Sequence, residues 1–337
     1  MTMSIVLEVF DSNPAKIYKI QNTSHIFVSC AYEEFEEMRK VEIMGIVNVT
    51  DNSYFAQSRC LSASGTPDLE KVLARVSAML EQGADIIDIG ACSTRPGSDP
   101  VGEAEEWRRL EPVLDALWRR FPEIRISIDT YWASVIERAW VQLKDIEGVD
   151  AASDDAASDK GLRNIKQRLI VNDISAGEDD PRMLPLVGSL GLRYIAMHKR
   201  GTPKTMQSLC DYDDVTESVA DYFRDFALRA AAAGIEDWIL DPGFGFAKTV
   251  EQNWELLRNL HRLSDAEFGG RKRDILVGVS RKSMIYRLYD ITPEEALPQT
   301  QILHYEALRQ GATILRVHDV AEAVRSVKSF GLLQGGR

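Results

Sequence analysis

The chain has 337 residues, of which 45% are hydrophobic and 27% charged, an ordinary composition for a folded globular protein. Its 40 basic and 52 acidic residues give a net charge of −12, which argues against general affinity for nucleic acid or an anionic membrane. No apolar run is long enough to span a membrane, and the first ten residues lack the basic start of a signal peptide, so we expect a cytoplasmic protein.

The chain divides into an N-terminal segment and a long repeating region. Residues 1–40 contain two strand-like stretches and an acidic segment, which we interpret as a hairpin or cap. Over residues 41–337, short β-branched apolar runs alternate with amphipathic segments, the pattern of strand–helix units around a parallel sheet. Eight strands are predicted, at 42–48, 85–90, 124–129, 168–173, 193–198, 238–242, 274–280 and 314–319. Helices are predicted among others at 68–82, 103–120, 215–233 and 293–309.

Eight strand–helix units predict a closed (β/α)8 barrel, or TIM barrel, because an open doubly wound sheet usually has five or six strands. The segment 144–167 departs from the pattern, since it is rich in Ala, Ser and Asp and lacks apolar periodicity. We interpret it as a solvated insertion before the fourth strand.

Nearly every predicted strand ends on a polar residue. In a (β/α)8 barrel the C-terminal strand ends and the loops after them build the active site, so these side chains are expected to meet at one mouth. The residues are Asn48, Asp129, Asn172, His198, Asp241, Ser280 and His318.

Two kinds of ligand chemistry follow from these strand ends. Asp129, Asn172 and Asp241 provide oxygen acceptors that suit a flat heterocycle rich in N–H donors. Phosphate sites in these barrels frequently follow the seventh and eighth strands, where a basic cluster could hold an anion that an acidic chain otherwise repels. This cluster consists of Lys282, Arg316 and His318.

Each residue alone also has a structural interpretation. A strand-end Asp often caps the following helix, and Asn48 could either bond to backbone or ligate Mg²⁺. Arg95 could grip a phosphate or carboxylate, but its Gly- and Pro-containing segment alone predicts a turn. His198 lacks a second ligand at metal spacing, so we interpret it as a packed or hydrogen-bonded residue of the mouth. The four cysteines are widely separated and predict neither a zinc site nor a disulfide framework.

Seven fragments in chain order together resemble the dihydropteroate synthase family, over residues 41–331. They are MGIVNVT, DIIDIGACSTRPG, ISIDT, VND, DPGFGF, GVSRKS and RVHD. The resemblance implies condensation of 6-hydroxymethyl-7,8-dihydropterin pyrophosphate with p-aminobenzoate, giving 7,8-dihydropteroate and pyrophosphate. It also implies Mg²⁺ as cofactor, a homodimer and a sulfonamide target.

The resemblance assigns roles residue by residue. The pterin would contact Asp129, Asn172, Asp241 and Lys282. Pyrophosphate would be held by Arg316, His318 and Asn48, with Mg²⁺ at Asn48. The p-aminobenzoate pocket would be shaped by Thr94, Arg95, Pro96, Phe246 and Ser283, and Ser280 is a further substrate-binding candidate. The residues expected to contribute directly to catalysis are Asn48, Arg95, Lys282, Arg316 and His318.

The first loop departs from the family pattern. The family usually has N-V-T-P-D-S-F, whereas this chain has N-V-T-D-N-S-Y, with Asp51 for the proline and Asn52 for the aspartate. The change raises loop freedom and moves or removes a carboxylate near the reacting centre. It motivates one alternative, a catalytically weak or silent pterin-binding paralogue. A second alternative, a methyltetrahydrofolate-type methyltransferase domain, should lack the STRPG and SRKS elements that are present here.

Overall fold

The computed structural model describes residues 41–50, 60–61, 65–92, 101–149, 156–202 and 204–334. The predicted cap at 1–40 lies outside the described residues. So do most of the loop after Asn48 and the predicted site residues Thr94, Arg95 and Pro96.

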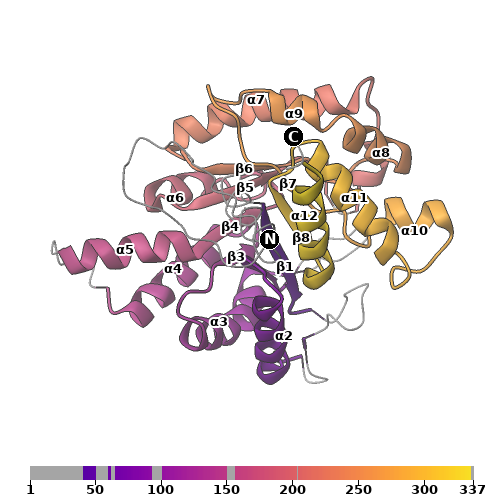
Figure 1. The fold of residues 1–337 in the computed structure, drawn as a ribbon. Coiled ribbons are helices and arrows are strands. Elements are labelled where there is room, and N and C mark those ends of the chain that lie inside the picture. Colours follow the sequence, from indigo (N-terminus) through magenta and orange to yellow (C-terminus); the bar gives the residue numbers. More distant parts are fainter. Residues whose placement is uncertain are drawn as a thin grey trace, which may run out of the picture.

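Eight parallel strands form the centre of the molecule (Figure 1). They are β1 (Glu42–Asn48), β2 (Ile86–Gly90), β3 (Ile126–Asp129), β4 (Leu169–Asp173), β5 (Arg193–Met197), β6 (Trp238–Asp241), β7 (Leu276–Val277) and β8 (Ile314–Val317). Neighbours in the sequence pair in the sheet, in the order β6-β5-β4-β3-β2-β1-β8-β7. A single parallel bridge between Leu240 and Ile275 joins β6 to β7. The predicted (β/α)8 barrel is therefore confirmed.

Helices surround the barrel and cover the outer face of its sheet (Figure 1). Several begin where the sequence supplies a capping side chain, as at Asp68, which accepts from the backbone N–H of Lys71, and in the reciprocal pair Thr249 and Gln252. The helices are α2 (Leu69–Glu81), α3 (Glu103–Arg120), α4 (Ala133–Glu147), α5 (Ala156–Arg168), α6 (Met183–Leu190), α7 (Val215–Ala233), α8 (Val250–Arg258), α9 (His261–Asp265), α10 (Ser283–Tyr289), α11 (Leu297–Arg309), α12 (Val320–Gln334) and the short 3₁₀ helix η2 (Met206–Ser208).

An apolar plug fills the lower part of the barrel. Side chains alternate along a strand, so every second residue points inward, and the lower inward positions carry large apolar groups. The plug consists of Met44, Ile86, Ile170, Ile195, Ile239, Leu276 and Ile314, all buried. The other strand face packs against the helices in the main core. Beyond the plug, toward the C-terminal ends of the strands, the inward positions include the polar residues Asp88, Asn172, Asp241 and Arg316.

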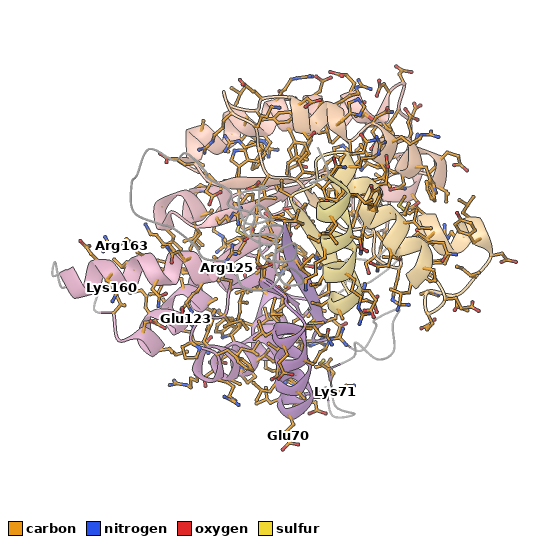
Figure 2. All side chains as sticks on the ribbon, viewed as in Figure 1. Glu70, Lys71, Glu123, Arg125, Lys160 and Arg163 are labelled. Atoms are coloured by element: carbon orange, nitrogen blue, oxygen red, sulfur yellow. The ribbon has the colours of Figure 1, made fainter. Side chains whose placement is uncertain are left out.

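Charged side chains are concentrated on the outside of the helices. Glu70 and Lys71 extend outward from α2, and Lys160 and Arg163 are exposed on α5 (Figure 2). Among the described residues, no helix is both long enough and apolar enough to cross a membrane.

The predicted element bounds agree closely with the structure, with three differences, of which the first is that the helix predicted at 293–309 begins at Leu297. The seventh strand is only Leu276–Val277, and the chain turns toward α10 farther on, at Arg281, whose φ is +53°. The segment 144–167 contains the end of α4 and most of α5, whereas the sequence predicted a solvated insertion.

Helix α5 is stabilised by a few specific contacts, which do not produce a periodic apolar pattern in the sequence. Glu147, at the end of α4, accepts a hydrogen bond of 3.0 Å from the Asn164 side chain and also pairs with Arg168. Ile165 is fully buried. A few specific contacts therefore stabilise the helix despite its weak apolar pattern.

The buried side chain of His304 in α11 predicts sensitivity to acid. Neither ring nitrogen has a hydrogen-bond partner among the described residues, and burial lowers the pKa of His304 to about 4. The folded state thus disfavours the protonated ring, so stability is full above the unfolded pKa near 6.5 and falls as the pH drops toward 4. Between pH 7 and pH 5 the wild-type protein should lose about 2 kcal/mol more of its free energy of unfolding than His304→Leu. Urea unfolding at both pH values measures the difference, and equal losses would contradict it.

Candidate active site at the barrel mouth

Polar side chains occupy the inward positions directly above the plug. Four of them lie two residues beyond a plug residue of the same strand, and Asp129 lies two residues beyond Ser127, whose hydroxyl donates to Asp88 inside the barrel. These residues are Asp88, Asp129, Asn172, Asp241 and Arg316. The expectation that the strand ends meet at one mouth is borne out for Asp129, Asn172 and Asp241.

Arg316 of β8 lies at the centre of this group. Its Nε donates to Asp88 Oδ2 at 2.8 Å, and its Nη2 lies 2.6 Å from the same oxygen and 2.8 Å from Asp129 Oδ2. Asp88 also accepts from the side chains of Ser127, at 2.7 Å, and Asn172, at 3.1 Å. Residues from four strands thus share one buried network.

The two carboxylates keep Arg316 charged. Burial alone would lower the pKa of Arg316, but Asp88 and Asp129 outweigh it and raise that pKa. Burial raises the pKa of Asp129 above its ordinary value, and Arg316 opposes this rise. Burial likewise raises the pKa of Asp241, against the opposing charge of Lys282. The mouth therefore combines strong acceptors with fixed positive charge in a desolvated setting, where electrostatic interactions are strong.

Lys282 reaches the mouth from the turn before α10. Its Nζ donates to the backbone oxygen of Phe244 at 2.5 Å and lies 5.3 Å from the centre of the Phe246 ring. Burial lowers the pKa of Lys282 to about 8, with Asp241 opposing the decrease. The side chain therefore stays mostly protonated at neutral pH, beside the loop that follows β6.

A second buried lysine fixes that loop. Gly243 has φ +70°, and a Cβ there would lie 2.0 Å from the backbone oxygen of His198, so the position requires glycine. Lys248 Nζ donates to the backbone oxygens of Gly243 and Phe246 and lies 2.9 Å from His198 Nδ1. His198 is thus a packed, hydrogen-bonded residue, as the sequence predicted.

His318 faces Ser280 above Arg316. The Ser280 hydroxyl lies 3.1 Å from Nδ1 of His318 and accepts from its backbone N–H at 3.2 Å. Burial, and then the charge of Arg316, lower the pKa of His318 to about 3. The imidazole is therefore neutral at pH 7, so the predicted basic cluster has two cations, and His318 can interact with an anion as a neutral hydrogen-bond donor.

Asn48 supplies the oxygen that a cation could use. It ends β1 at an inward position, four residues beyond Met44 of the plug, and is half-buried. Within the described ranges no group of three His, Cys, Asp or Glu side chains could hold a metal. One amide oxygen fits Mg²⁺, which usually takes one or two protein oxygens together with waters and substrate phosphates.

The three described cysteines, Cys60, Cys92 and Cys210, form no disulfide. Burial raises the pKa of the Cys92 thiol to about 11, so Cys92 is no thiolate nucleophile at neutral pH.

Asp88 is the site residue that the sequence analysis missed. It lies inside the fragment DIIDIG, whose apolar residues predict an ordinary buried strand. The sequence does contain a signal for Asp88, because a charged residue inside a buried strand requires a partner of opposite charge. Arg316, which lies in another predicted strand, can provide that charge.

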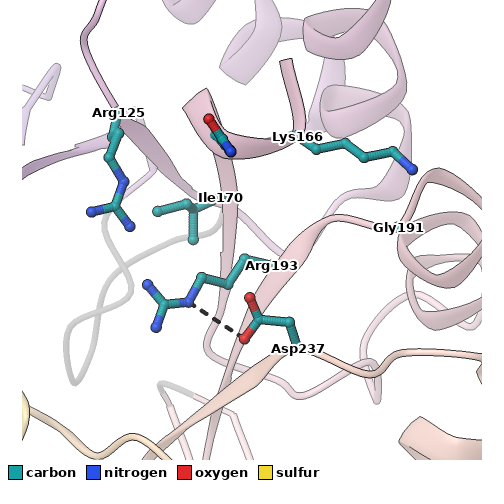
Figure 3. Close-up of a pocket in the computed structure, with 7 residues that line it drawn as sticks. Arg125, Lys166, Ile170, Gly191, Arg193 and Asp237 are labelled. Atoms are coloured by element: carbon teal, nitrogen blue, oxygen red, sulfur yellow. Dashed lines mark ion pairs between the residues drawn. The ribbon is translucent and has the colours of Figure 1, made fainter. Parts of the chain in front are cut away.

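A separate cavity of about 460 Å³ lies at the N-terminal ends of the strands (Figure 3). Its lining residues are Arg125, Lys166, Gln167, Ile170, Gly191, Arg193 and Asp237. Arg193 pairs with Asp237 and Glu42, and Arg125 also pairs with Glu42. Ile170 belongs to the plug, which separates this cavity from the mouth. Because active sites of these barrels lie at the C-terminal ends of the strands, the position of this cavity favours the mouth as the active site.

Comparisons with known proteins agree with the family resemblance found in the sequence. The family model described as pterin binding enzyme matches residues 44–157 and 148–318. The dihydropteroate synthase of Escherichia coli K12 is 38% identical over 289 residues, which cover 85% of this chain and 89% of that protein. The Haemophilus influenzae dihydropteroate synthase is 36% identical and covers 83% of this chain and 89% of its own length.

Solved structures extend the similarity to the fold. The Yersinia pestis dihydropteroate synthase in a sulfonamide drug complex has a TM-score of 0.73 and 33% identity, covering 88% of this chain and 95% of that one. The Burkholderia cenocepacia dihydropteroate synthase complexed with 7,8-dihydropteroate has a TM-score of 0.71 and 31% identity, covering 88% and 93%.

Proposed function

The chain belongs to the dihydropteroate synthase family, and from this premise we propose how its barrel mouth performs the family reaction. The enzyme condenses 6-hydroxymethyl-7,8-dihydropterin pyrophosphate with p-aminobenzoate to form 7,8-dihydropteroate and pyrophosphate. The observation that best supports the mouth as the site is the buried network of Arg316 with Asp88, Asp129 and Asn172.

The pterin would bind deepest, against the acceptors above the plug. Asp129, Asn172 and Asp241 can accept hydrogen bonds from the ring N–H and amino groups of a pterin. Lys282, beside Asp241 and the Phe244 carbonyl, would donate to an acceptor atom of the same ring. This division matches donors on the ligand with acceptors on the protein.

The pyrophosphate would lie farther out, near the end of β8. Arg316 would contribute positive charge, and neutral His318 would contribute a hydrogen-bond donor. Asn48 would hold Mg²⁺ jointly with phosphate oxygens, and the bound ion would supply charge neutralisation on the leaving group.

The p-aminobenzoate pocket would lie between the second and sixth strand ends. Phe246, close to Lys282 Nζ, and Ser283, at the start of α10, would form one side. Thr94, Arg95 and Pro96 would form the other side and hold the carboxylate. Sulfonamides would then compete with p-aminobenzoate at this pocket.

The chemistry requires placed charges more than proton transfer. When the bond between the pterin methylene and the pyrophosphate breaks, positive charge spreads into the pterin ring and negative charge grows on the leaving group. Asp129 and Asp241 would stabilise the positive charge on the pterin. Arg316 and His318 would stabilise the negative charge on the pyrophosphate. The neutral arylamine forms a bond to the methylene carbon as the carbon–oxygen bond to pyrophosphate breaks, and its nitrogen then loses one proton to solvent. No strong general base is needed, since the amine is already nucleophilic at pH 7.

Pyrophosphate release by the purified protein tests this proposal. Dihydropterin pyrophosphate and Mg²⁺ are supplied with and without p-aminobenzoate. Release that depends on p-aminobenzoate is expected. Pterin binding without release would indicate the silent paralogue, and absence of pterin binding would contradict the site assignment.

The altered first loop should be competent. We expect Asp51→Pro/Asn52→Asp, which restores the family pattern, to leave turnover nearly unchanged, because Asp51 keeps a carboxylate one position earlier. Steady-state turnover of this variant is compared with that of Asp51→Asn, which removes the remaining carboxylate and should be slower. A large gain on restoring the pattern would instead support a catalytically weak protein.

We also propose that the enzyme works as a cytoplasmic homodimer, as the family resemblance implies. Sedimentation equilibrium at micromolar concentration tests the dimer, and a monomer mass there would contradict it.

A further inference from the structure

Asp88 is fully buried and receives hydrogen bonds from side chains of three other strands, β3, β4 and β8. Its Oδ1 accepts from Ser127 of β3 at 2.7 Å and from Asn172 of β4 at 3.1 Å. Its Oδ2 is approached by Nε and Nη2 of Arg316 at 2.8 and 2.6 Å. Asp88 lies one inward position below Gly90, which ends β2, so it supports the mouth from underneath.

This carboxylate determines which end of the Asn172 amide faces a ligand. An ionised carboxylate can only accept hydrogen bonds, so the NH₂ group of Asn172 must point toward Asp88. The amide oxygen then lies at the other end of the group, available to accept from a ligand N–H. Without Asp88, either orientation of the amide would be possible.

The same carboxylate fixes the Arg316 guanidinium. A guanidinium is a rigid planar fork, and two of its nitrogens, Nε and Nη2, are held by Asp88. Asp129 binds Nη2 as well, and neither carboxylate takes Nη1. The contact therefore fixes the plane of the group while leaving Nη1 for another anion.

We propose that Asp88 is a positioning residue: it orients the Asn172 amide toward the pterin and holds the Arg316 guanidinium in place for the reaction, without touching the substrate. This inference rests on the proposed roles of Asn172 and Arg316. It predicts that changes at Asp88 weaken the binding of dihydropterin pyrophosphate and leave the binding of p-aminobenzoate unchanged.

The Asp88→Asn variant tests the amide orientation. Its own oxygen must face Arg316, so its NH₂ group would oppose that of Asn172 and force that amide to turn. Asn172 would then present a donor to the donor groups of the pterin. The dissociation constant for dihydropterin pyrophosphate, measured by calorimetry without p-aminobenzoate, should rise about 10- to 100-fold. The KM for p-aminobenzoate should stay unchanged.

The exchange variant Asp88→Asn/Asn172→Asp provides a rescue. Its amide at position 88 can donate to the new carboxylate at position 172 and accept from Arg316. The carboxylate keeps an acceptor toward the pterin, and the net charge is that of the wild type. Pterin should bind to this double variant more tightly than to either single variant. The comparison with Asn172→Asp remains available if Asp88→Asn does not fold.

Asp173→Asn is the matched control. Asp173 is equally buried, but it accepts from Ser175 and Tyr194 on the face of β4 that packs against helices. Its loss should lower the melting temperature and leave pterin affinity unchanged. Wild-type pterin affinity in Asp88→Asn, or no recovery in the double variant, would overturn the inference. If Lys282→Met also binds pterin normally, the site assignment itself fails; if only the Asp88 variants behave normally, the positioning role alone fails.

Discussion

Arg316→Ala is expected to lower kcat by about 10²- to 10³-fold, the usual cost of removing one placed charge from an electrostatic site. The substitution removes positive charge where pyrophosphate leaves, and it leaves Asp88 and Asp129 facing each other without their shared cation. Pyrophosphate should also become a much weaker product inhibitor. Both quantities come from p-aminobenzoate-dependent pyrophosphate release.

The Arg316→Lys variant separates charge from geometry. A lysine retains the positive charge but cannot bind two carboxylates as a planar fork, so its kcat should lie between those of the wild type and Arg316→Ala. Thermal unfolding identifies variants that have lost the fold. Unchanged kcat and unchanged pyrophosphate inhibition in a folded alanine variant would contradict the proposed role.

Lys282→Met should weaken pterin binding about 10²-fold. It should also abolish the decrease in pterin affinity that we expect for the wild type as the pH rises through 8. Lys282 has a pKa of about 8, so it is charged below pH 8 and neutral above it. Wild-type affinity for dihydropterin pyrophosphate should therefore fall as the pH rises through 8. The groups that face Lys282 are Asp129, Asp241, Lys248 and Arg316.

The Lys282→Met variant shows which lysine causes the decrease in pterin affinity through pH 8. Burial lowers the pKa of the neighbouring Lys248 to about 7, so that residue titrates nearby. If affinity still falls through pH 8 in Lys282→Met, another group causes the decrease and the prediction is wrong. Lys272→Met, at an exposed lysine away from the mouth, should retain the full wild-type profile.

Much of the fold could be predicted from the sequence because its signals are local. The eight apolar runs match the eight strands, and the predicted helices at 103–120 and 215–233 coincide with α3 and α7. The helical nature of 156–168 could not be predicted, since α5 depends on contacts of Asn164 and Arg168 with Glu147. Such contacts join separate elements and leave no periodic pattern.

The site was predicted in part for a similar reason. Strand-end residues such as Asp129 and Asp241 reach the mouth because the barrel topology brings strand ends together. The pairing of Arg316 with Asp88 joins residues 228 positions apart, and no spacing rule reports it. The neutral state of His318 also depends on burial and on Arg316, which only the assembled barrel establishes.

The single bridge between β6 and β7 gives the barrel a seam. The other neighbouring strands are joined by ladders of two to five residue pairs, whereas Leu240 and Ile275 alone form a bridge here. Asp241 is the last residue of β6, on one side of this seam. Lys282 lies in the turn after β7, on the other side. A ligand held by both residues would span the seam, so occupying the site would also raise the free energy needed for the barrel to open locally at this point.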